Sequence, residues 1–191
     1  MKTDYIKPSV YKKIYQLMQY ENALALRLSL ETGMRIGDVL SLTPDQLVGR
    51  TVRFTAQKTG KKATKVITAD LAKRLKQISN KRFIFVGRFG DKPRARQTVW
   101  KDVKKAAKTL KLKENAACHS ARKTYAVELY HNEGLPSVQK ELQHDHSDTT
   151  MIYAFADLLT DKGRDNSDFD VDMLAEKIAE KVVEKIEHLF R

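Results

Sequence analysis

The stretch ENALALRLSLETGMRIGDVLSL, residues 21–42, decides the fold of this chain. Residues 21–32 are apolar on most faces of a helix, which is typical of a helix at the centre of a domain. Gly33 is placed to end that helix, because glycine readily adopts the left-handed conformation found there. The segment IGDVLSL then predicts a short second helix, so Arg35 stands at a corner between two helices.

Outward from this corner the chain predicts a mainly α domain with a small antiparallel β-sheet, an α+β fold. Pro8 opens an earlier helix, and helical spacing recurs at 71–78, 98–110, 119–133, 136–143 and 148–158. The alternating, β-branched segments 51–57 and 64–69 flank KTGKK and predict a hairpin with a basic tip. RFIFV at 82–86 predicts a third strand.

The end of the chain differs in composition from the rest. We assign residues 1–159 to the folded domain, residues 160–169 to a linker and residues 170–191 to a charged helix with an apolar stripe. Such a stripe needs a covering surface. The final helix therefore packs either on its own domain or on a second copy of the chain, and the sequence leaves both open.

The charge indicates a polyanionic partner. The chain has 36 Lys and Arg against 24 Asp and Glu, a net charge of +12, and the basic excess lies before residue 157. Nucleic acid is the simplest partner for such a body, although charge can also serve solubility alone. No apolar run could span a membrane, the N-terminus lacks a secretory signal, and Cys118 is the only cysteine. We expect a cytoplasmic protein without a disulfide framework.

Four segments place polar side chains where they could carry chemistry. Arg35 and Asp38 are three residues apart, Lys58 lies at the hairpin tip, and His119 and Arg122 share a face at a helix start, a favourable place for a phosphate. In the last segment Tyr153 follows His144 by nine residues. Each taken singly also fits a plain role, as a surface pair, a solubilising lysine, a helix surface or a core tyrosine.

The run around His144, HDHSD, does not predict a metal centre. Neighbouring positions point to different sides, and no further ligand spacing is present.

Taken together, in order and spacing, these segments resemble the catalytic domain of the tyrosine recombinase, or phage integrase, family. The resemblance covers about residues 8–155. The matching positions are the first arginine box Thr32-Gly33-Met34-Arg35 with Asp38, the hairpin lysine Lys58, the H-x-x-R box at His119 and Arg122, and the last box at Leu142, His144, Thr149-Thr150 and Tyr153.

The chain departs from the family pattern at a few places. Gln143 stands where the family usually has glycine, and Ala121 and Lys123 replace the more usual Leu and His of the second box. Members usually carry an N-terminal helical domain that clamps the DNA, whereas few residues here precede the first helix. We expect either a minimal recombinase or a catalytic fragment.

The resemblance implies a site-specific DNA recombinase that cleaves and rejoins strands through a 3′-phosphotyrosine. Tyr153 is then the nucleophile and His119 its base. Arg35, Arg122 and His144 stabilise the negative charge on the non-bridging phosphate oxygens, and Lys58 is the general acid. Asp38 orients Arg35 or a neighbour.

The implied partners are double-stranded DNA and further copies of the chain, as a tetramer on DNA in which C-terminal helices are exchanged. No membrane partner, metal or other cofactor is expected, because fixed cations can replace Mg²⁺. Candidate DNA backbone contacts are Arg53, Lys61, Lys62, Lys65, Arg94, Arg96, Lys101 and Lys123.

Three alternatives remain at this point. A degenerate recombinase could bind DNA as a regulator, and a type IB topoisomerase shares a tyrosine-centred site. An RNA-binding helical domain has only the basic charge in its favour.

Overall fold

The computed structural model of the chain describes residues 3–142. The chain divides into two compact units, residues 1–160 and 161–191, and all described residues belong to the first. The helix expected at 148–158, the linker 160–169 and the helix 170–191 lie outside the described residues.

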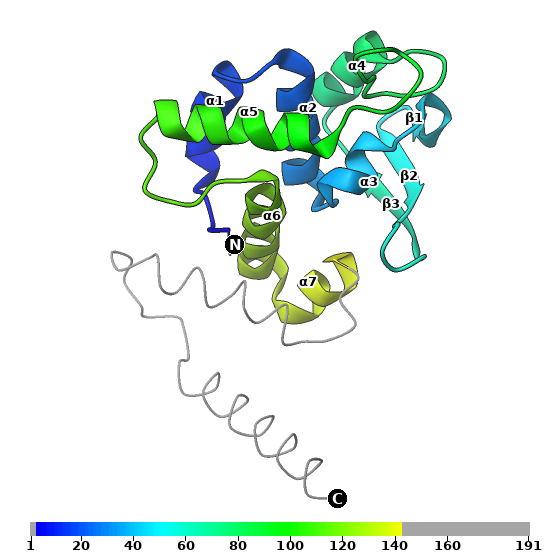
Figure 1. The fold of residues 1–191 in the computed structure, drawn as a ribbon. Coiled ribbons are helices and arrows are strands. Elements are labelled where there is room, and N and C mark those ends of the chain that lie inside the picture. Colours follow the sequence, from blue (N-terminus) through cyan, green and yellow to red (C-terminus); the bar gives the residue numbers. More distant parts are fainter. Residues whose placement is uncertain (1–2, 143–191) are drawn as a thin grey trace, which may run out of the picture. The chain divides into compact units, whose positions relative to one another are not determined.

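The described part is mainly helical with one small sheet (Figure 1), which confirms the expected fold class. The helices are α1 Pro8–Gln16, α2 Tyr20–Thr32, α3 Ile36–Leu40, α4 Ala69–Ile78, α5 Arg96–Thr109, α6 Cys118–Glu133 and α7 Leu135–Leu142. The strands are β1 Leu47–Val48, β2 Thr51–Thr55 and β3 Lys62–Val66, with one 3-10 turn at Pro44–Gln46. None of the described helices is long and apolar enough to cross a bilayer.

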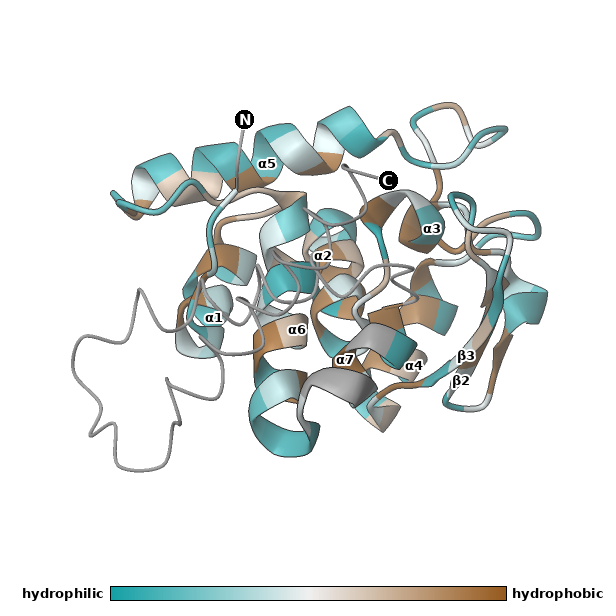
Figure 2. Ribbon diagram, turned by 90° about the horizontal axis from the view of Figure 1, so that it is seen from below, coloured by the Kyte–Doolittle hydropathy of each residue, from teal (hydrophilic) through white to brown (hydrophobic). Residues whose placement is uncertain are grey.

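Helix α2 is the centre of the core, as its apolar sequence predicts. It contacts α1, α3, α4, α5 and α6. Leu24, Ala25, Leu26 and Leu28 on this helix are all buried. In Figure 2 hydrophobic residues face inward around α2, while the outer side of α5 is mostly hydrophilic. Because α2 is packed on so many sides, its orientation is fixed, and so is the position of the Arg35 corner at its C-terminal end.

The corner itself is built on Gly33. This residue has φ +69°, and a Cβ placed there would lie 2.4 Å from the Tyr125 ring. The Ser29 hydroxyl donates a 2.7 Å hydrogen bond to the Met34 carbonyl just beyond the glycine. Only glycine satisfies both the left-handed backbone and the close approach of α6.

The sheet is a three-stranded antiparallel meander in the order β1-β2-β3. The predicted hairpin is present, with Thr55 paired to Lys62 at its tip. β2 ends at Thr55, two residues before the expected end at 57, whereas β3 begins at Lys62, two residues nearer the tip than the expected start at 64. Residues 56–61 form the turn between them. The Gly60 N–H donates to the Ala56 carbonyl at 2.8 Å within it.

The strand expected at RFIFV is absent, and β1 is the third strand of the sheet instead. Ile84 and Phe85 are fully buried, and the Ile84 N–H donates to the Leu42 carbonyl at 3.0 Å. The segment makes only an isolated bridge between Val86 and Pro93. Its apolar run reflects burial of an irregular connection in the core, which by sequence alone looks like a strand.

Candidate active site

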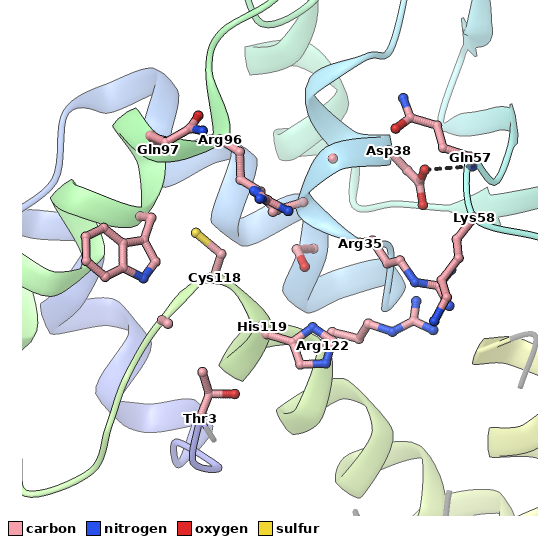
Figure 3. Close-up of a pocket in the computed structure, with 15 residues that line it drawn as sticks. Thr3, Arg35, Asp38, Gln57, Lys58, Arg96, Gln97, Cys118, His119 and Arg122 are labelled. Atoms are coloured by element: carbon pink, nitrogen blue, oxygen red, sulfur yellow. Dashed lines mark hydrogen bonds between the residues drawn. The ribbon is translucent and has the colours of Figure 1, made fainter. Parts of the chain in front are cut away.

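One cavity of about 680 Å³ brings together five of the predicted site residues. They come from α3, the hairpin and α6, and Figure 3 shows the side chains of Arg35, Lys58 and Arg122 extending toward the same part of it. His144 and Tyr153 lie outside the described residues. The five are Arg35, Asp38, Lys58, His119 and Arg122.

Arg122 is the most firmly held of these side chains. It lies on α6 and is only 4% exposed. Its guanidinium donates to the Gly33 carbonyl at 2.5 Å and to the Leu142 carbonyl at 2.7 Å. Both carbonyls lie at helix ends, where backbone acceptors lack partners within the helix. Arg122 therefore joins the Arg35 corner to the last residue of α7.

Arg35 is the residue from which α3 starts, in an extended conformation with φ −66° and ψ 142°. The turn at Gly33 and the short helix that follows direct its side chain into the cavity (Figure 3). Two guanidinium groups thus border one recess, a pairing suited to a phosphate with several charged oxygens.

Asp38 orients the hairpin. It is 4% exposed, and its Oδ1 accepts a 3.0 Å hydrogen bond from the backbone N–H of Gln57 (Figure 3). Gln57 directly precedes Lys58, so a carboxylate of α3 anchors the turn that carries the lysine. Lys58 itself is exposed and extends into the cavity from this turn.

His119 is the second residue of α6 and lines the cavity while remaining open to solvent. Desolvation of the ring, together with the positive charges of Arg122, Lys123 and Arg35, lowers its pKa to about 4. The imidazole is therefore neutral near pH 7 and able to accept a proton. The hydroxyl of Ser120 accepts a 3.1 Å hydrogen bond from the Ala117 N–H and so helps to close the start of α6.

Further residues of the cavity were not singled out from the sequence. They include Gln97 and Trp100 of α5, beside the predicted Arg96. Trp100 is four positions after Arg96, so helical spacing places the two on one face and could have indicated it. Cys118 also borders the cavity, and burial raises the pKa of its thiol to about 11, which keeps it protonated near pH 7.

The eight candidate DNA contacts fall into three groups by exposure: five are exposed, one is half-buried and two are buried. Exposed positions are held by Arg53, Lys61, Lys62, Arg96 and Lys101. Arg94 is half-buried and bonded to Asn22, at 3.2 Å, and to Glu21, at 3.6 Å.

Lys65 and Lys123 are both buried, which corrects the expectation that they lie on the DNA-facing surface. The Lys65 ammonium pairs with Glu141, and that of Lys123 donates to the Thr3 carbonyl. Sequence patterns flagged them as basic but could not reveal these partners. Over residues 3–142, no group of three or more His, Cys, Asp or Glu is placed to hold a metal ion.

Comparisons with known proteins show the family and the fold of the chain. The sequence profile of the phage integrase family matches residues 4–158. Tyrosine recombinase XerD of Halalkalibacterium halodurans is 28% identical over 145 residues, which cover 69% of this chain and 48% of that protein. The chain thus spans about half the length of this relative.

Solved structures share the fold at low sequence identity. A lambda integrase dimer bound to a COC′ core site has a TM-score of 0.69 at 20% identity, covering 90% of this chain and 52% of that one. The catalytic domain of bacteriophage HP1 integrase has a TM-score of 0.63 at 19% identity, covering 81% and 89%. Because the family profile matches most of its length and recombinase domains share its fold, the chain belongs to the phage integrase family of tyrosine recombinases.

Proposed function

We propose that this chain is a site-specific DNA recombinase that cleaves and rejoins DNA strands through a covalent bond between Tyr153 and a 3′-phosphate. The observation that carries the proposal is the cavity of about 680 Å³ lined by Arg35, Lys58, His119 and Arg122. These groups could surround a single phosphodiester, and the family membership of the chain supports the assignment.

In the proposed first step the phenol oxygen of Tyr153 attacks phosphorus, and the bond from phosphorus to the 5′-oxygen breaks. His119, neutral because its pKa is lowered, takes the phenol proton. Lys58 gives a proton to the departing 5′-oxygen. Rejoining is the reverse attack by a 5′-hydroxyl, and the phosphotyrosine retains the energy of the broken bond.

Negative charge on the non-bridging oxygens is stabilised by Arg35 and Arg122, with His144 as a further donor. Because two backbone carbonyls hold the Arg122 guanidinium before the substrate arrives, this donor needs little reorganisation as the charge develops. We propose no metal or other cofactor for this step. Asp38 acts through the turn that it anchors and has no direct contact with the reacting atoms.

The proposed partner is double-stranded DNA. The solved lambda integrase is a dimer bound to a core site, and XerH is bound to its difH substrate. For this chain, the exposed cations Arg53, Lys61, Lys62, Arg96 and Lys101 are proposed to contact phosphates. We also propose a tetramer on DNA that exchanges the helix at 170–191. Light scattering of the full chain and of a chain ending at Asp165, each with and without DNA, tests the exchange.

A covalent trapping experiment tests the function. Nicked duplexes with randomised flanks are incubated with the chain, and denaturing gels isolate duplexes that stay attached to protein, which also identifies the preferred site. We expect a covalent band with the natural chain and none with Tyr153→Phe. Tyr20→Phe is the matched control, because Tyr20 is an exposed tyrosine outside the cavity.

The other outcomes are equally informative. A band that persists in Tyr153→Phe would show that the nucleophile is a different residue. Sequence-specific binding with no covalent band would instead make the chain a DNA-binding regulator. Relaxation of supercoils without a preferred site would point to a topoisomerase-like activity.

A further inference from the structure

Lys65 is a lysine at the buried position of strand β3. It is 9% exposed, although its strand neighbours Thr64 and Val66 are exposed. Its ammonium pairs with the Glu141 carboxylate and also donates to the Glu141 carbonyl at 3.2 Å. It lies 5.6 Å from the centre of the Tyr125 ring, and the Tyr125 hydroxyl donates to the Glu141 carboxylate at 3.3 Å. Lys65, Glu141 and Tyr125 thus form one partly buried polar cluster between β3, α7 and α6.

A buried ammonium is costly unless it is paired and hydrogen-bonded, and an apolar residue would fill this strand position more simply. The lysine fixes the position of α7 relative to the sheet. It bonds to Glu141 through both the side chain and the backbone, whereas an apolar contact would let α7 slide along the sheet.

The cluster stands beside the cationic side chains of the cavity. A small pocket next to it is lined by Arg35, Arg122 and Lys65 together. The last turn of α7 therefore presents two successive carbonyls, Glu141 and Leu142, that are held by two cations, Lys65 and Arg122. Cations at the C-terminal end of a helix also interact favourably with its dipole.

The hairpin is consequently anchored from two sides. Asp38 holds the start of the turn through the Gln57 N–H, and Lys65 holds the returning strand to α7. Lys65 pairs with Val52 in the sheet, three pairs from the tip at Thr55 and Lys62. Both anchors therefore restrict the positions that the hairpin tip, and with it Lys58, can occupy.

We propose that Lys65 and Glu141 are positioning residues that tie the Lys58 hairpin to the end of α7, so that the proton donor and the Arg122 site keep one fixed geometry. This inference rests on the proposed function for its meaning, but the tie itself is a property of the fold. It predicts that breaking the pair disturbs proton delivery to the leaving oxygen more than the other steps of cleavage.

The experiment compares Glu141→Leu, the double variant Lys65→Met/Glu141→Leu and the matched control Arg74→Met, which breaks the exposed Arg74–Asp70 ion pair. Single-turnover cleavage is measured on a fresh duplex of the sequence identified by covalent trapping, with the protein at saturating concentration. We expect Glu141→Leu to slow cleavage about 10- to 100-fold, as misplacement of a catalytic group does, and Arg74→Met to leave the rate unchanged.

The double variant separates position from stability. Because Lys65 is buried and Glu141 is partly buried, replacing both members of the ion pair by apolar residues removes the charge that a single substitution leaves unpaired, which often restores stability. We expect urea unfolding of the double variant to return to that of the natural chain while cleavage stays slow. Recovery of cleavage together with stability would overturn the proposal, because the pair would then serve stability alone.

A second substrate identifies the step that is disturbed. In a duplex with a 5′-bridging phosphorothiolate the leaving group is a thiolate, which is stable without a proton from Lys58 because thiols are far more acidic than alcohols. We expect this duplex to restore most of the rate of Glu141→Leu. An equal loss on both duplexes would overturn the assignment to Lys58.

Hydrogen exchange distinguishes a failure of this inference from a failure of the proposed function. If the natural chain cleaves neither duplex, the proposed function fails, but exchange at the amides of residues 56–61 still tests the tie. We expect several-fold faster exchange there in Glu141→Leu and no change in Arg74→Met. Unchanged exchange in Glu141→Leu would overturn the tie.

Discussion

Arg122 and Lys58 line the same cavity but are held in opposite ways. Arg122 is buried on α6, and its guanidinium is bonded to the carbonyls of Gly33 and Leu142. Lys58 is exposed on a turn that the Asp38–Gln57 hydrogen bond links to the helical body. The helical corner is thus set by packing, and the hairpin tip by a few polar contacts.

This difference matches the chemistry proposed for each side. Negative charge on the non-bridging phosphate oxygens is best stabilised by donors that do not move, which burial of Arg122 provides. A proton donor is needed only at the leaving oxygen, and the anchored hairpin holds the exposed Lys58 side chain within reach of that position.

The largest expected effect is a difference in unfolding free energy between variants of Arg122 and Lys58. Arg122→Ala leaves two helix-end carbonyls without their donor, so we expect roughly 3 kcal/mol or more of lost unfolding free energy. Cleavage should also fall by roughly 100-fold or more. Lys58→Ala should lose cleavage to a similar extent, yet change stability by no more than about 0.5 kcal/mol. Urea unfolding and single-turnover cleavage measure the two quantities.

Equal stability losses in the two variants would contradict the comparison, because the hairpin tip would then be as firmly integrated as the corner. Arg122→Lys refines the result. It retains the charge but cannot reach two carbonyls with a planar fork, so we expect a loss intermediate between the natural chain and Arg122→Ala.

The next largest effect is the loss of unfolding free energy when alanine replaces either of two glycines that have similar backbone conformations. Gly33 and Gly60 have φ +69° and +67°, but a Cβ at Gly33 meets the Tyr125 ring at 2.4 Å, whereas one at Gly60 meets nothing within 4 Å. We expect Gly60→Ala to cost about 1 kcal/mol for the left-handed backbone. Gly33→Ala should cost roughly 3 kcal/mol because α6 must also shift. Thermal or urea unfolding of both variants measures the difference, and similar losses would show that α6 yields easily.

The corner was predictable from the sequence and the polar interior was not. The apolar run of α2, the glycine stop and the start of α3 all follow from local pattern, and so does the hairpin. The pairing of Lys65 with Glu141 joins residues 76 positions apart, and no periodicity signals it. The same holds for RFIFV, since an apolar run alone does not distinguish a paired strand from a buried irregular connection.

A smaller effect concerns His119 and pH. Its pKa of about 4 lies below the value of 6.5 for an exposed histidine. Between these values the unfolded chain binds the proton and the folded chain does not, so this group's contribution to stability is present above pH 6.5 and declines as the pH falls toward 4. His119→Gln should flatten the pH dependence of unfolding in that window. If the pH dependence of unfolding is unaltered in His119→Gln, the titrating group is a different residue.

The same group reports on occupancy of the cavity. A bound phosphodiester is anionic and favours the protonated ring, so we expect DNA to raise the His119 pKa. NMR titration of labelled histidine with and without the trapped duplex measures this shift. A lowered or constant pKa would place the phosphate away from the ring.

The smallest effect compares exposed and buried lysines in DNA binding. Lys62→Ala should reduce the slope of log affinity against log salt concentration by about 1, as expected for one phosphate contact. Lys65→Met should leave that slope unchanged, because the ammonium of Lys65 is committed to Glu141. Fluorescence anisotropy over a salt series measures both. A reduced slope for Lys65→Met would mean that DNA reaches this lysine after all.

The two hydrogen bonds of Arg122 also bear on biosynthesis. One spans 89 positions back to Gly33 and the other 20 positions forward to Leu142. Contacts this distant in sequence close late, because a long loop must be ordered before they form. A nascent chain can therefore complete both hydrogen bonds of Arg122 only after residue 142 has left the ribosome, so shorter translation products lack the second acceptor of this guanidinium.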